Sequence, residues 1–386
     1  MNVDFITQDF PPALGGIQTY SAELVTRLNQ MGMSVTVHAP NHEGAQTLDQ
    51  SLDYKVCRYN VPNPYLGARL LFGYKSHLEK NHVDVVFHAQ WQTTIASIRA
   101  KRNGAKIRIF CAAHARELFL NPLSLSKSGQ LSARFVERRK RLFQQVDHFF
   151  PVSNYTASLL IDAGVKTEKI TVIPNGTNPQ RFFPSDGDGK ELRKKLGFGA
   201  RKIIYSISRL VPTKGIDTIL DAMPLVIKKH SDALYVIGGT GPDEQRLKTK
   251  VMALGLSNHV FFTGRIADDQ LNAYYNMADV FVMVSRQEKV NVEGFGIVFL
   301  EANACEKPVI GSYTGGIPDA VLEGETGFLV GSDDTQTLSE RINQLMSNEE
   351  LSLSMGKKGR DRVLSQFNWD TVANRLYTRM KELMEE

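Results

Sequence analysis

The segment NVEGFGIVFLEA at residues 291–302 indicates the fold class, because it shows how a strand passes into a helix. It follows the apolar run 280–285, whose length and composition predict a buried strand. Gly294 and Gly296 permit a tight turn and a close approach of the backbone to a ligand. The apolar residues after Gly296 predict a helix, whose free N-terminal N–H groups can bind a phosphate. The segment therefore predicts a strand–turn–helix unit of an α/β protein.

The same alternation of short apolar runs and longer amphipathic stretches extends along the chain in both directions. In the first half we expect strands at residues 3–6, 35–39, 83–88, 106–112, 148–152 and 169–173. In the second half we expect strands at residues 203–208, 234–238, 260–263, 280–285, 308–311 and 327–330. Helices are expected between most of them, among them 17–31, 216–227 and 155–163, the last capped by Asn154. Strands that alternate with helices predict parallel sheets covered on both faces.

Residues 174–189 interrupt this pattern with proline, glycine and aspartate, which are typical of turns and linkers. Two doubly wound domains are therefore expected, with a deep cleft between them as the natural ligand site. The first would span residues 1–178 and the second residues 179–368. The triplet DGD at 186–188 could hold a divalent ion under a nucleotide. Because it falls in the expected linker and not at a strand end, we expect no metal there.

Composition limits the class of protein. The chain has 386 residues, of which 42% are hydrophobic and 23% charged, which is typical of a globular protein with about two domains. No apolar run approaches the ~18–20 residues that span a bilayer, and the first residues do not resemble a secretory signal. Three distant cysteines, Cys57, Cys111 and Cys305, indicate neither a disulfide framework nor a zinc site. We expect a cytoplasmic protein.

The net charge of +5 is unevenly distributed. Residues 1–180 hold 20 Lys/Arg and 13 Asp/Glu, a net of +7, and the remainder holds 26 and 28, a net of −2. No nucleic-acid motif accompanies the basic half, so an anionic membrane surface is the expected partner, with scattered solubilising charge as the alternative. Residues 127–142 predict a basic amphipathic helix that could rest on such a surface, at the inner face of the plasma membrane. The same residues are equally compatible with a helix that covers the protein's own sheet.

Charged residues in two strand-to-helix segments are the first candidates for chemistry. Glu293 and Glu301 stand eight positions apart, and Glu301 falls on an otherwise apolar stretch, where a carboxylate needs a partner such as sugar hydroxyls. Arg209 and Lys214 stand five positions apart between a strand and a helix, where both cations can converge on a diphosphate. The alternative interpretations are surface carboxylates and a pair of solvated cations.

Glycine turns and one histidine complete the candidates. Gly15-Gly16 precedes the first helix, and Gly239 lies in a glycine turn after a strand, where either could let a phosphate pass close to the backbone. Neither turn belongs to a GxGxxG or GxxxxGK[ST] motif, so no dinucleotide or P-loop fingerprint is present. His114 ends an apolar strand, the position that binds ligands in doubly wound sheets. Plain turns and a structural histidine remain the alternatives.

In combination these motifs resemble retaining family 4 glycosyltransferases of the GT-B fold. The run from Glu293 to Glu301 matches the E-x7-E signature of that family, and the resemblance extends over nearly the whole chain. Further matching motifs are residues 15–16, 174–176, 208–209 with 214–215, 263–265 and 315–319. Residues 9–12 together with 15–18 are most similar to the mannosyltransferases that act on phosphatidylinositol mannosides.

The resemblance implies roles for the candidate residues. Glu293, Arg209, Lys214 and His114 would be the catalytic set: the two cations bind the donor diphosphate, Glu293 contacts the transferred sugar and His114 binds a sugar hydroxyl. The donor would otherwise be held by the residues Gly16, Gly239, Arg265, Ile266, Phe295, Gly296, Ile297, Val298 and Glu301. Glu301 would bind the ribose, and Arg265 and Ile266 would flank the nucleobase. No metal and no cofactor would be required beyond a GDP-sugar or UDP-sugar donor.

The expected function is therefore transfer of a hexose, of the mannose or glucose type, to a lipid-linked or glycan acceptor in cell-envelope or polysaccharide synthesis. The first domain would bind the acceptor, the second the nucleotide sugar, and the last helix, about 369–386, would pack back on the first. Transfer to a small soluble acceptor, a sugar-nucleotide epimerase or phosphorylase of the same architecture, and a binding protein with an inactive site are the alternatives. The sequence does not indicate an oligomeric state.

Overall fold

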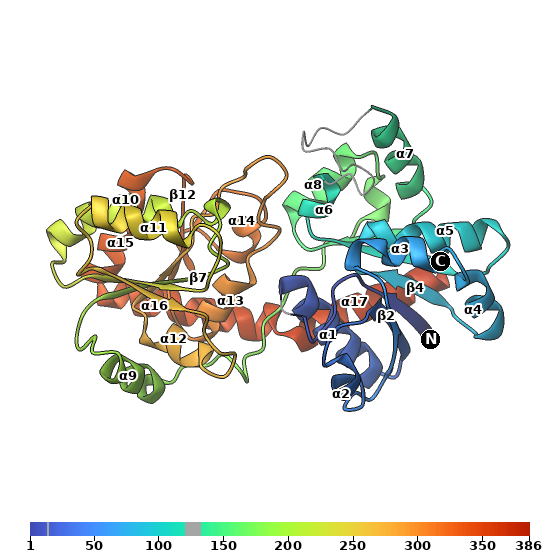
Figure 1. Cartoon of the computed structure of the whole chain (residues 1–386), viewed down its shortest axis with the longest axis horizontal. Helices are drawn as coiled ribbons and strands as arrows, with labels where there is room; N and C mark the ends of the chain where they lie inside the picture. Colours follow the sequence, from blue (N-terminus) through green and yellow to red (C-terminus); the bar gives the residue numbers. More distant parts are fainter. Residues whose placement is uncertain (14, 120–132) are drawn as a thin grey trace. The chain divides into compact units, whose positions relative to one another are not determined.

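A computed structural model of the chain describes residues 1–13, 15–119 and 133–386, and side chains in the helix that starts at Ala133 are described from Val136 onward. The described residues form two compact units. Unit 1 comprises Met1–Asn175 with Trp369–Glu386, and unit 2 comprises Gly176–Asn368. The observed boundary after Asn175 lies three residues before the boundary expected after residue 178, in the same turn-rich segment. Each unit is an α/β sandwich around a parallel sheet (Figure 1).

The sheet of unit 1 has six described strands in the order β3-β2-β1-β4-β5-β6, all parallel. The strands are β1 Asn2–Ile6, β2 Ser34–Pro40, β3 Lys55–Tyr59, β4 Val85–His88, β5 Arg108–Ala113 and β6 His148–Pro151. The α-helices are α1 Gly16–Gln30, α2 Ala45–Asp49, α3 Leu66–Leu70, α4 Tyr74–Lys80, α5 Thr94–Arg102, α6 Arg116–Phe119, α7 Ala133–Phe143, α8 Asn154–Asp162 and α17 Trp369–Glu385. Short 3-10 turns are η1 Asn63–Tyr65, η2 Trp91–Thr93 and η3 Thr167–Lys169.

Unit 2 repeats this plan with the strand order β12-β11-β10-β7-β8-β9, again all parallel. The strands are β7 Ile203–Ile207, β8 Leu234–Gly238, β9 Val260–Gly264, β10 Val280–Val282, β11 Val309–Ser312 and β12 Gly327–Val330. The α-helices are α9 Asp186–Lys195, α10 Ile216–Lys229, α11 Glu244–Ala253, α12 Leu271–Met277, α13 Ile297–Ala304, α14 Ile317–Ala320, α15 Thr335–Ser347 and α16 Glu349–Arg362. Two short helical segments are η4 Pro212–Lys214 and η5 Val363–Phe367, the latter a π-helical turn.

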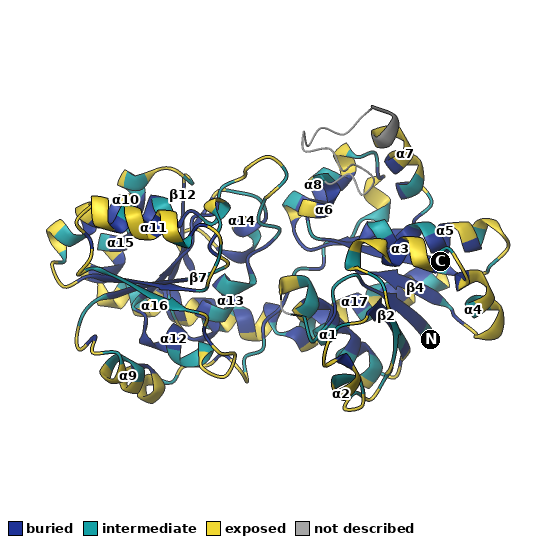
Figure 2. Cartoon of the chain, in the orientation of Figure 1, coloured by how far each residue is buried: buried dark blue, intermediate teal, exposed yellow. Residues whose placement is uncertain are grey.

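Burial explains why the strands are continuous apolar runs in the sequence. Central strands such as β4 and β8 are buried at every position, because helices cover both faces of each sheet (Figure 2). The helices are buried on one side only, as α10 shows with an apolar face against the sheet and exposed lysines at its end. None of the described helices is long and apolar enough to cross a membrane.

In each unit the order in which strands are added to the sheet changes direction beside the first strand, which is the topological switch point. In unit 1 the chain moves outward from β1 to β3 and then returns to β4 on the other side of β1. In unit 2 it moves from β7 to β9 and returns to β10 beside β7. Ligands of doubly wound sheets bind outside the carboxyl ends of the strands at such a reversal. Ligand-binding residues are therefore expected in the loops after β1 and β4, and in those after β7 and β10.

The last helix, α17, packs beside α1 within unit 1 (Figure 1). Its apolar side is buried, and Trp369 lies edge-on to Tyr20 with ring centroids 6.3 Å apart. At the surface of this contact Arg27 Nε donates a hydrogen bond to Asp370 at 2.6 Å. The C-terminal segment thus completes the hydrophobic core of the unit that begins the chain.

Several local predictions were wrong. The expected strand at 169–173 is a 3-10 turn followed by a single bridge from Ile170 to Phe149, while strand β3 was not anticipated. The N-cap of α8 is Ser153, whose Oγ accepts a hydrogen bond from the Thr156 N–H at 3.1 Å, and Asn154 is already helical. The DGD triplet at 186–188 forms the first turn of α9, because aspartates near a helix N-terminus stabilise it.

Candidate active site

The loop after β7 and the loop after β10 bring opposite charges together in unit 2. Lys214 lies at the end of η4, and its Nζ donates a hydrogen bond to Glu293 Oε2 at 2.5 Å. Both side chains are largely buried, with exposures of 25% and 19%. Two residues that are 79 positions apart in sequence therefore meet at the topological switch point, where β7 and β10 lie side by side. This contact is the centre of the candidate site.

Glycines fix the backbone around this pair. Gly215 adopts a left-handed conformation with φ of 67°, and a Cβ there would lie 2.0 Å from the Val284 carbonyl oxygen. The Gly315-Gly316 turn after β11 holds the backbone of Glu293: the Gly316 N–H donates to the Glu293 carbonyl at 2.9 Å. A Cβ on Gly315 would lie 2.2 Å from that same oxygen. Only glycine permits these approaches, so glycines fix the backbone next to Lys214 and at Glu293.

Helix α13 starts directly after the pair. Gly296 is its N-cap with φ of 91°, and no side chain caps the helix. The first N–H groups of a helix have no intrahelical acceptor and carry partial positive charge. The N–H groups of Ile297 and Val298 therefore stand available to an anion. Phe295 differs from the expectation, because its side chain is 1% exposed and packs near Phe367, so only its backbone can meet a donor.

Glu301 lies one turn further along α13 and is held by a tyrosine. Its Oε2 accepts a hydrogen bond from Tyr275 OH at 2.5 Å. Burial raises the pKa of Glu301, while the bond from Tyr275 and the charge of Arg181 act in the opposite direction. The other carboxylate oxygen, Oε1, can then accept a hydrogen bond from a hydroxyl group of a ligand. Tyr275 was not anticipated, since a tyrosine in an apolar helix gives no sequence signal of this role.

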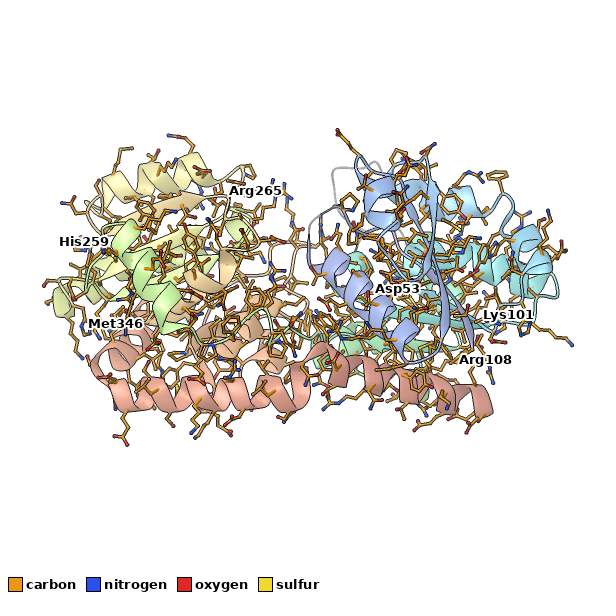
Figure 3. All side chains as sticks on the ribbon, turned by 90° about the horizontal axis from the view of Figure 1, so that it is seen from below. Asp53, Lys101, Arg108, His259, Arg265 and Met346 are labelled. Carbon is orange, nitrogen blue, oxygen red and sulfur yellow. The ribbon has the colours of Figure 1, made fainter. Side chains whose placement is uncertain are left out.

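The remaining expected donor residues of unit 2 lie at neighbouring strand ends. Arg209 follows β7 and is exposed, and its guanidinium has no hydrogen-bond or ion-pair partner among the described residues. Arg265 follows β9 and is also exposed (Figure 3), whereas Ile266 is 9% exposed and packs toward Gly238. Gly239 has φ of 106°, and a Cβ there would lie 2.0 Å from the Ser208 carbonyl. Gly239 is thus required by the packing of two loops, whatever it binds.

Polar side chains of unit 1 lie close together at the topological switch point of its sheet, beyond the ends of β1 and β4. Asp9, just beyond β1, accepts hydrogen bonds from Gln90 Nε2 at 2.7 Å and Gln18 Nε2 at 3.0 Å. Burial raises the pKa of Asp9, and the bonds from Asn63 and Gln90 oppose that rise. Gly16, the first residue of α1, has open space where a Cβ would be. Asp9 and Gln90 were not predicted as site residues, although their positions directly after strands could have indicated them.

His114 lies at the end of β5, as expected, and its tautomer follows from its contacts. Its Nε2 lies 3.1 Å from the Ala89 carbonyl oxygen, which can only accept, so the ring carries its hydrogen on Nε2. Burial lowers the pKa of His114 to about 4, with the Ala89 contact opposing, so the ring is neutral at pH 7. Nδ1 is then an acceptor. The next residue, Ala115, has φ of 75°, a strained conformation of the kind that gathers at functional sites.

Glu117 supports this loop. Its Oε1 accepts a hydrogen bond from the His114 backbone N–H at 2.5 Å, and its side chain is buried. Burial raises the pKa of Glu117 to about 7, while bonds from the backbone and the charge of Arg116 limit the rise. Sequence reasoning missed this residue, because an isolated glutamate gives no indication of burial.

A polar cavity of about 500 Å³ opens next to Asp9, at the carboxyl ends of β2 and β3. Its wall includes Asn41, whose Nδ2 donates to Asn60 Oδ1 at 2.9 Å, and Asn63, which reaches Asp9 at 3.4 Å. His42 Nε2 is buried there without a hydrogen-bond partner among the described residues. Amide, imidazole and carboxylate groups around a cavity suit a ligand rich in hydroxyls.

The basic segment expected at 127–142 is described only in part, since residues 127–132 lie outside the described residues. Its later part belongs to α7, where Arg138 and Arg141 are exposed and Arg141 pairs with Glu137 at 3.2 Å. Arg139 is 9% exposed; it donates to the Leu118 carbonyl and lies over the Phe143 ring. Arg139 therefore packs on the protein itself and is not available to a membrane surface.

Two Rossmann-like units with charged residues at their strand ends are the arrangement of a GT-B protein. Residues 188–362 match the family model "Glycosyl transferases group 1", and residues 14–181 match "Glycosyltransferase Family 4". The chain therefore belongs to the family 4 glycosyltransferases and is a hexosyltransferase.

Individual relatives extend this match over the full chain. It is 33% identical over 382 residues to a GDP-mannose-dependent alpha-(1-6)-phosphatidylinositol monomannoside mannosyltransferase of Mycobacterium tuberculosis, covering 96% of both chains. It is 31% identical over 380 residues to a GDP-mannose-dependent monoacylated alpha-(1-6)-phosphatidylinositol monomannoside mannosyltransferase of Corynebacterium glutamicum, covering 96% of this chain and 95% of the relative. The structure of Anabaena Alr3699/HepE in complex with UDP has the same fold, with a TM-score of 0.81 at 21% identity, covering 99% of this chain and 100% of that chain.

Proposed function

We propose that the protein transfers mannose from GDP-mannose to a hydroxyl of a lipid headgroup, with retention of the anomeric configuration. The lipid headgroup is a polyol or a mannosylated polyol. The choice of donor and acceptor is supported by relatives that are 31–33% identical over nearly the whole chain and carry those substrates in their names. The chemistry is supported by one observation in unit 2, the contact between Lys214 and Glu293 beside the uncapped start of α13.

The site suits the departure of a diphosphate. Breaking the bond between the sugar C1 and the β-phosphate oxygen leaves negative charge on the nucleoside diphosphate. Lys214, Arg209 and the N–H groups that begin α13 present positive charge to that group, which stabilises the transition state without a metal ion. When the diphosphate engages Lys214, the ion pair with Glu293 is exchanged, and the Glu293 carboxylate becomes available to the transferred sugar.

Retention requires that the acceptor oxygen bonds to C1 on the face from which the diphosphate leaves. In this proposal the acceptor hydroxyl attacks that face, and its proton passes to the departing phosphate oxygen. Glu293 stabilises the positive charge that develops on the sugar ring and does not form a covalent intermediate. Glu301 binds the ribose hydroxyls through its free carboxylate oxygen, and backbone groups at Arg265 and Ile266 flank the guanine.

Unit 1 is proposed to bind the acceptor and to complete the contacts with the sugar. Neutral His114 accepts a hydrogen bond from a sugar hydroxyl through Nδ1, and Gly16 allows the donor phosphates to approach the backbone. The cavity beside Asp9 takes the hydroxyl groups of the acceptor headgroup. An enzyme of this kind would act in cell-envelope or polysaccharide synthesis, in the cytoplasm and at the inner face of the plasma membrane.

A transfer assay with radiolabelled sugar nucleotides tests the proposal. The full-length protein is incubated with GDP-mannose, UDP-glucose or UDP-galactose, and with phosphatidylinositol mannoside, free inositol phosphate or no acceptor. We expect product only with GDP-mannose and the lipid. Product with the soluble polyol alone would assign a small soluble acceptor, and conversion of the nucleotide sugar without transfer would assign an epimerase; either overturns the proposal.

A further inference from the structure

Three residues inside unit 1, away from the strand ends, form a cluster of metal-ligating side chains. Asp4 lies on β1, His38 on β2 and His77 on α4, and one ligand atom from each lies within 4.8 Å of the others. Strand register pairs Ile6 with His38, and Asp4 shares a face with Ile6 two positions on, so both side chains project from one face of the sheet. Helix α4 supplies His77 above that face.

Burial makes this cluster costly unless every polar atom has a partner. The side chains of Asp4 and His38 are 4% and 1% exposed. Burial by itself would raise the pKa of Asp4, but the contacts with His38 and His77 hold that pKa well below its ordinary value, so the carboxylate is charged. His77 Nε2 and the Tyr74 hydroxyl satisfy Oδ2 at 3.0 and 2.8 Å. His38 Nε2 has no hydrogen-bond partner among the described residues, although it lies 3.3 Å from Asp4 Oδ1.

We propose that Asp4, His38 and His77 bind a divalent transition-metal ion, with Zn²⁺ as the best fit. Zinc bonds to imidazole nitrogen and carboxylate oxygen are about 2.0–2.2 Å long, which sets neighbouring ligand atoms of a tetrahedron about 3.3 Å apart. His38 Nε2 lies 3.3 Å from Asp4 Oδ1 and His77 Nε2 lies 3.0 Å from Asp4 Oδ2, so each imidazole is near that spacing from one oxygen of the carboxylate. Two imidazoles and one carboxylate favour zinc, cobalt or nickel over magnesium or calcium.

Polar neighbours contact the other nitrogen of each ring and so limit its orientation. His38 Nδ1 lies 2.8 Å from the Tyr59 hydroxyl, which can accept a hydrogen bond from Nδ1 when an ion occupies Nε2. His77 Nδ1 lies 3.3 Å from the Asn81 amide, so His77 carries its hydrogen on Nε2, toward Asp4, before the ion binds. A neutral imidazole binds an ion through its unprotonated nitrogen, so this hydrogen moves to Nδ1 when the ion occupies Nε2. His77 is 25% exposed and offers a path for entry.

Such an ion would tie β1, β2 and α4 together. β2 carries His38 and leads directly into Asn41 and His42 of the cavity wall, so the site would stabilise one wall of the candidate acceptor cavity without touching the donor chemistry. The proposal is independent of the proposed transferase activity, because its consequence is the stability of unit 1.

Cobalt titration of the full-length, chelator-treated protein tests this site. We expect saturable 1:1 binding with visible ligand-field absorption of four- or five-coordinate Co²⁺, displacement by Zn²⁺ and a rise in Tm. His77→Gln should weaken binding more than tenfold. Tyr59→Phe keeps all three ligands but loses the hydrogen bond to His38, and should weaken binding about tenfold.

His82→Gln is the matched control, since His82 is 81% exposed in the same unit and pairs with Asp84 at 3.0 Å. Circular dichroism establishes that each variant is folded. Absence of saturable binding at millimolar Co²⁺ and Zn²⁺ would overturn the proposal, and the cluster would then be a buried hydrogen-bond network. Binding that survives His77→Gln but is lost in His82→Gln would overturn it equally, by assigning the ion to the surface.

Discussion

At the level of single residues, the proposed transfer depends most on Lys214 and Glu293, which contact each other in unit 2. A single positioned group that stabilises developing charge contributes about 10²–10³ in kcat. We expect Lys214→Ala and Glu293→Gln each to lower kcat by about that factor, with little change in Tm, because both lie in loops.

Steady-state transfer and a melting curve check this expectation. Lys190→Ala is the control, as Lys190 is an exposed cation on α9 in the same unit. Near-normal turnover in either site variant would remove that residue from the mechanism.

Buried titratable groups in unit 1 predict opposing pH effects on stability. Burial lowers the pKa of His114 to about 4 and of His88 to about 3, below the ordinary 6.5, so the unfolded state takes up protons first and stability falls as the pH drops below 6.5. Burial raises the pKa of Glu117 to about 7, above its ordinary 4.5. The stabilising contribution of Glu117 is therefore complete below pH 4.5 and is lost as the pH rises through 7.

Glu117→Gln removes the opposing contribution while keeping an acceptor for the His114 N–H. We expect the variant to lose free energy of unfolding more steeply than the wild type between pH 7 and pH 5, as measured by urea denaturation. Parallel curves for the two proteins would show that Glu117 does not titrate in this range.

Among the helices and strands, the start of α13 depends on Gly296. A Cβ at this residue would lie 2.7 Å from the Phe299 ring, and the left-handed backbone disfavours any other residue. We expect Gly296→Ala to cost about 1–3 kcal/mol of stability and to raise the KM for the sugar nucleotide, since the helix N-terminus would shift away from the diphosphate.

Gly187→Ala is the matched control for that substitution. Gly187 lies in the first turn of α9, and no atom lies within 4 Å of the position that an alanine methyl would take, so alanine there should be neutral or stabilising. Equal KM values for the sugar nucleotide in the two variants would show that the start of α13 does not bind the donor.

For the molecule as a whole, transfer should not require a metal ion. Arg209, Lys214 and the start of α13 supply the positive charge that a metal would otherwise supply. We expect excess EDTA to leave the initial transfer rate unchanged, even though removal of an ion from the Asp4 cluster would lower the Tm. Activity that is lost with EDTA and regained only with Mg²⁺ or Mn²⁺ would contradict this.

Membrane association is the other expectation for the whole molecule. Each basic residue near an anionic bilayer contributes about 1 kcal/mol, and salt weakens that attraction. With Arg139 packed inside, Arg138 and Arg141 are the exposed arginines that α7 offers in its described part. We expect sedimentation with anionic but not neutral vesicles, and weaker sedimentation in Arg138→Glu/Arg141→Glu.

Lys80→Glu/Lys106→Glu serves as the charge-matched control, because it reverses two exposed cations of the same unit that lie outside α7. Equal binding to both kinds of vesicle, or to neither at low salt, would leave a soluble acceptor as the better interpretation.

The fold class and the main candidate residues of unit 2 could be predicted from the amino-acid sequence. Strands buried on both faces must be apolar throughout, so β7, β8 and β12 are recognisable from composition alone. Glu293, Lys214 and Gly296 could be singled out because strand ends in doubly wound sheets carry ligands. Strand β3 was missed because it is only half-buried and because Lys55 and Arg58 interrupt its apolar residues, which leaves neither an apolar run nor a strict alternation.

Which distant groups meet could be learned only from the folded chain. Glu293 meets Lys214, Glu301 meets Tyr275, and Asp4 meets two histidines 34 and 73 positions away, because strand order and helix packing, not local pattern, set those distances. Burial depends on the fold in the same way. In the sequence Arg139 resembles a surface cation and Glu117 a surface carboxylate, but the packing of α6 and α7 removes both from water and changes what each can do.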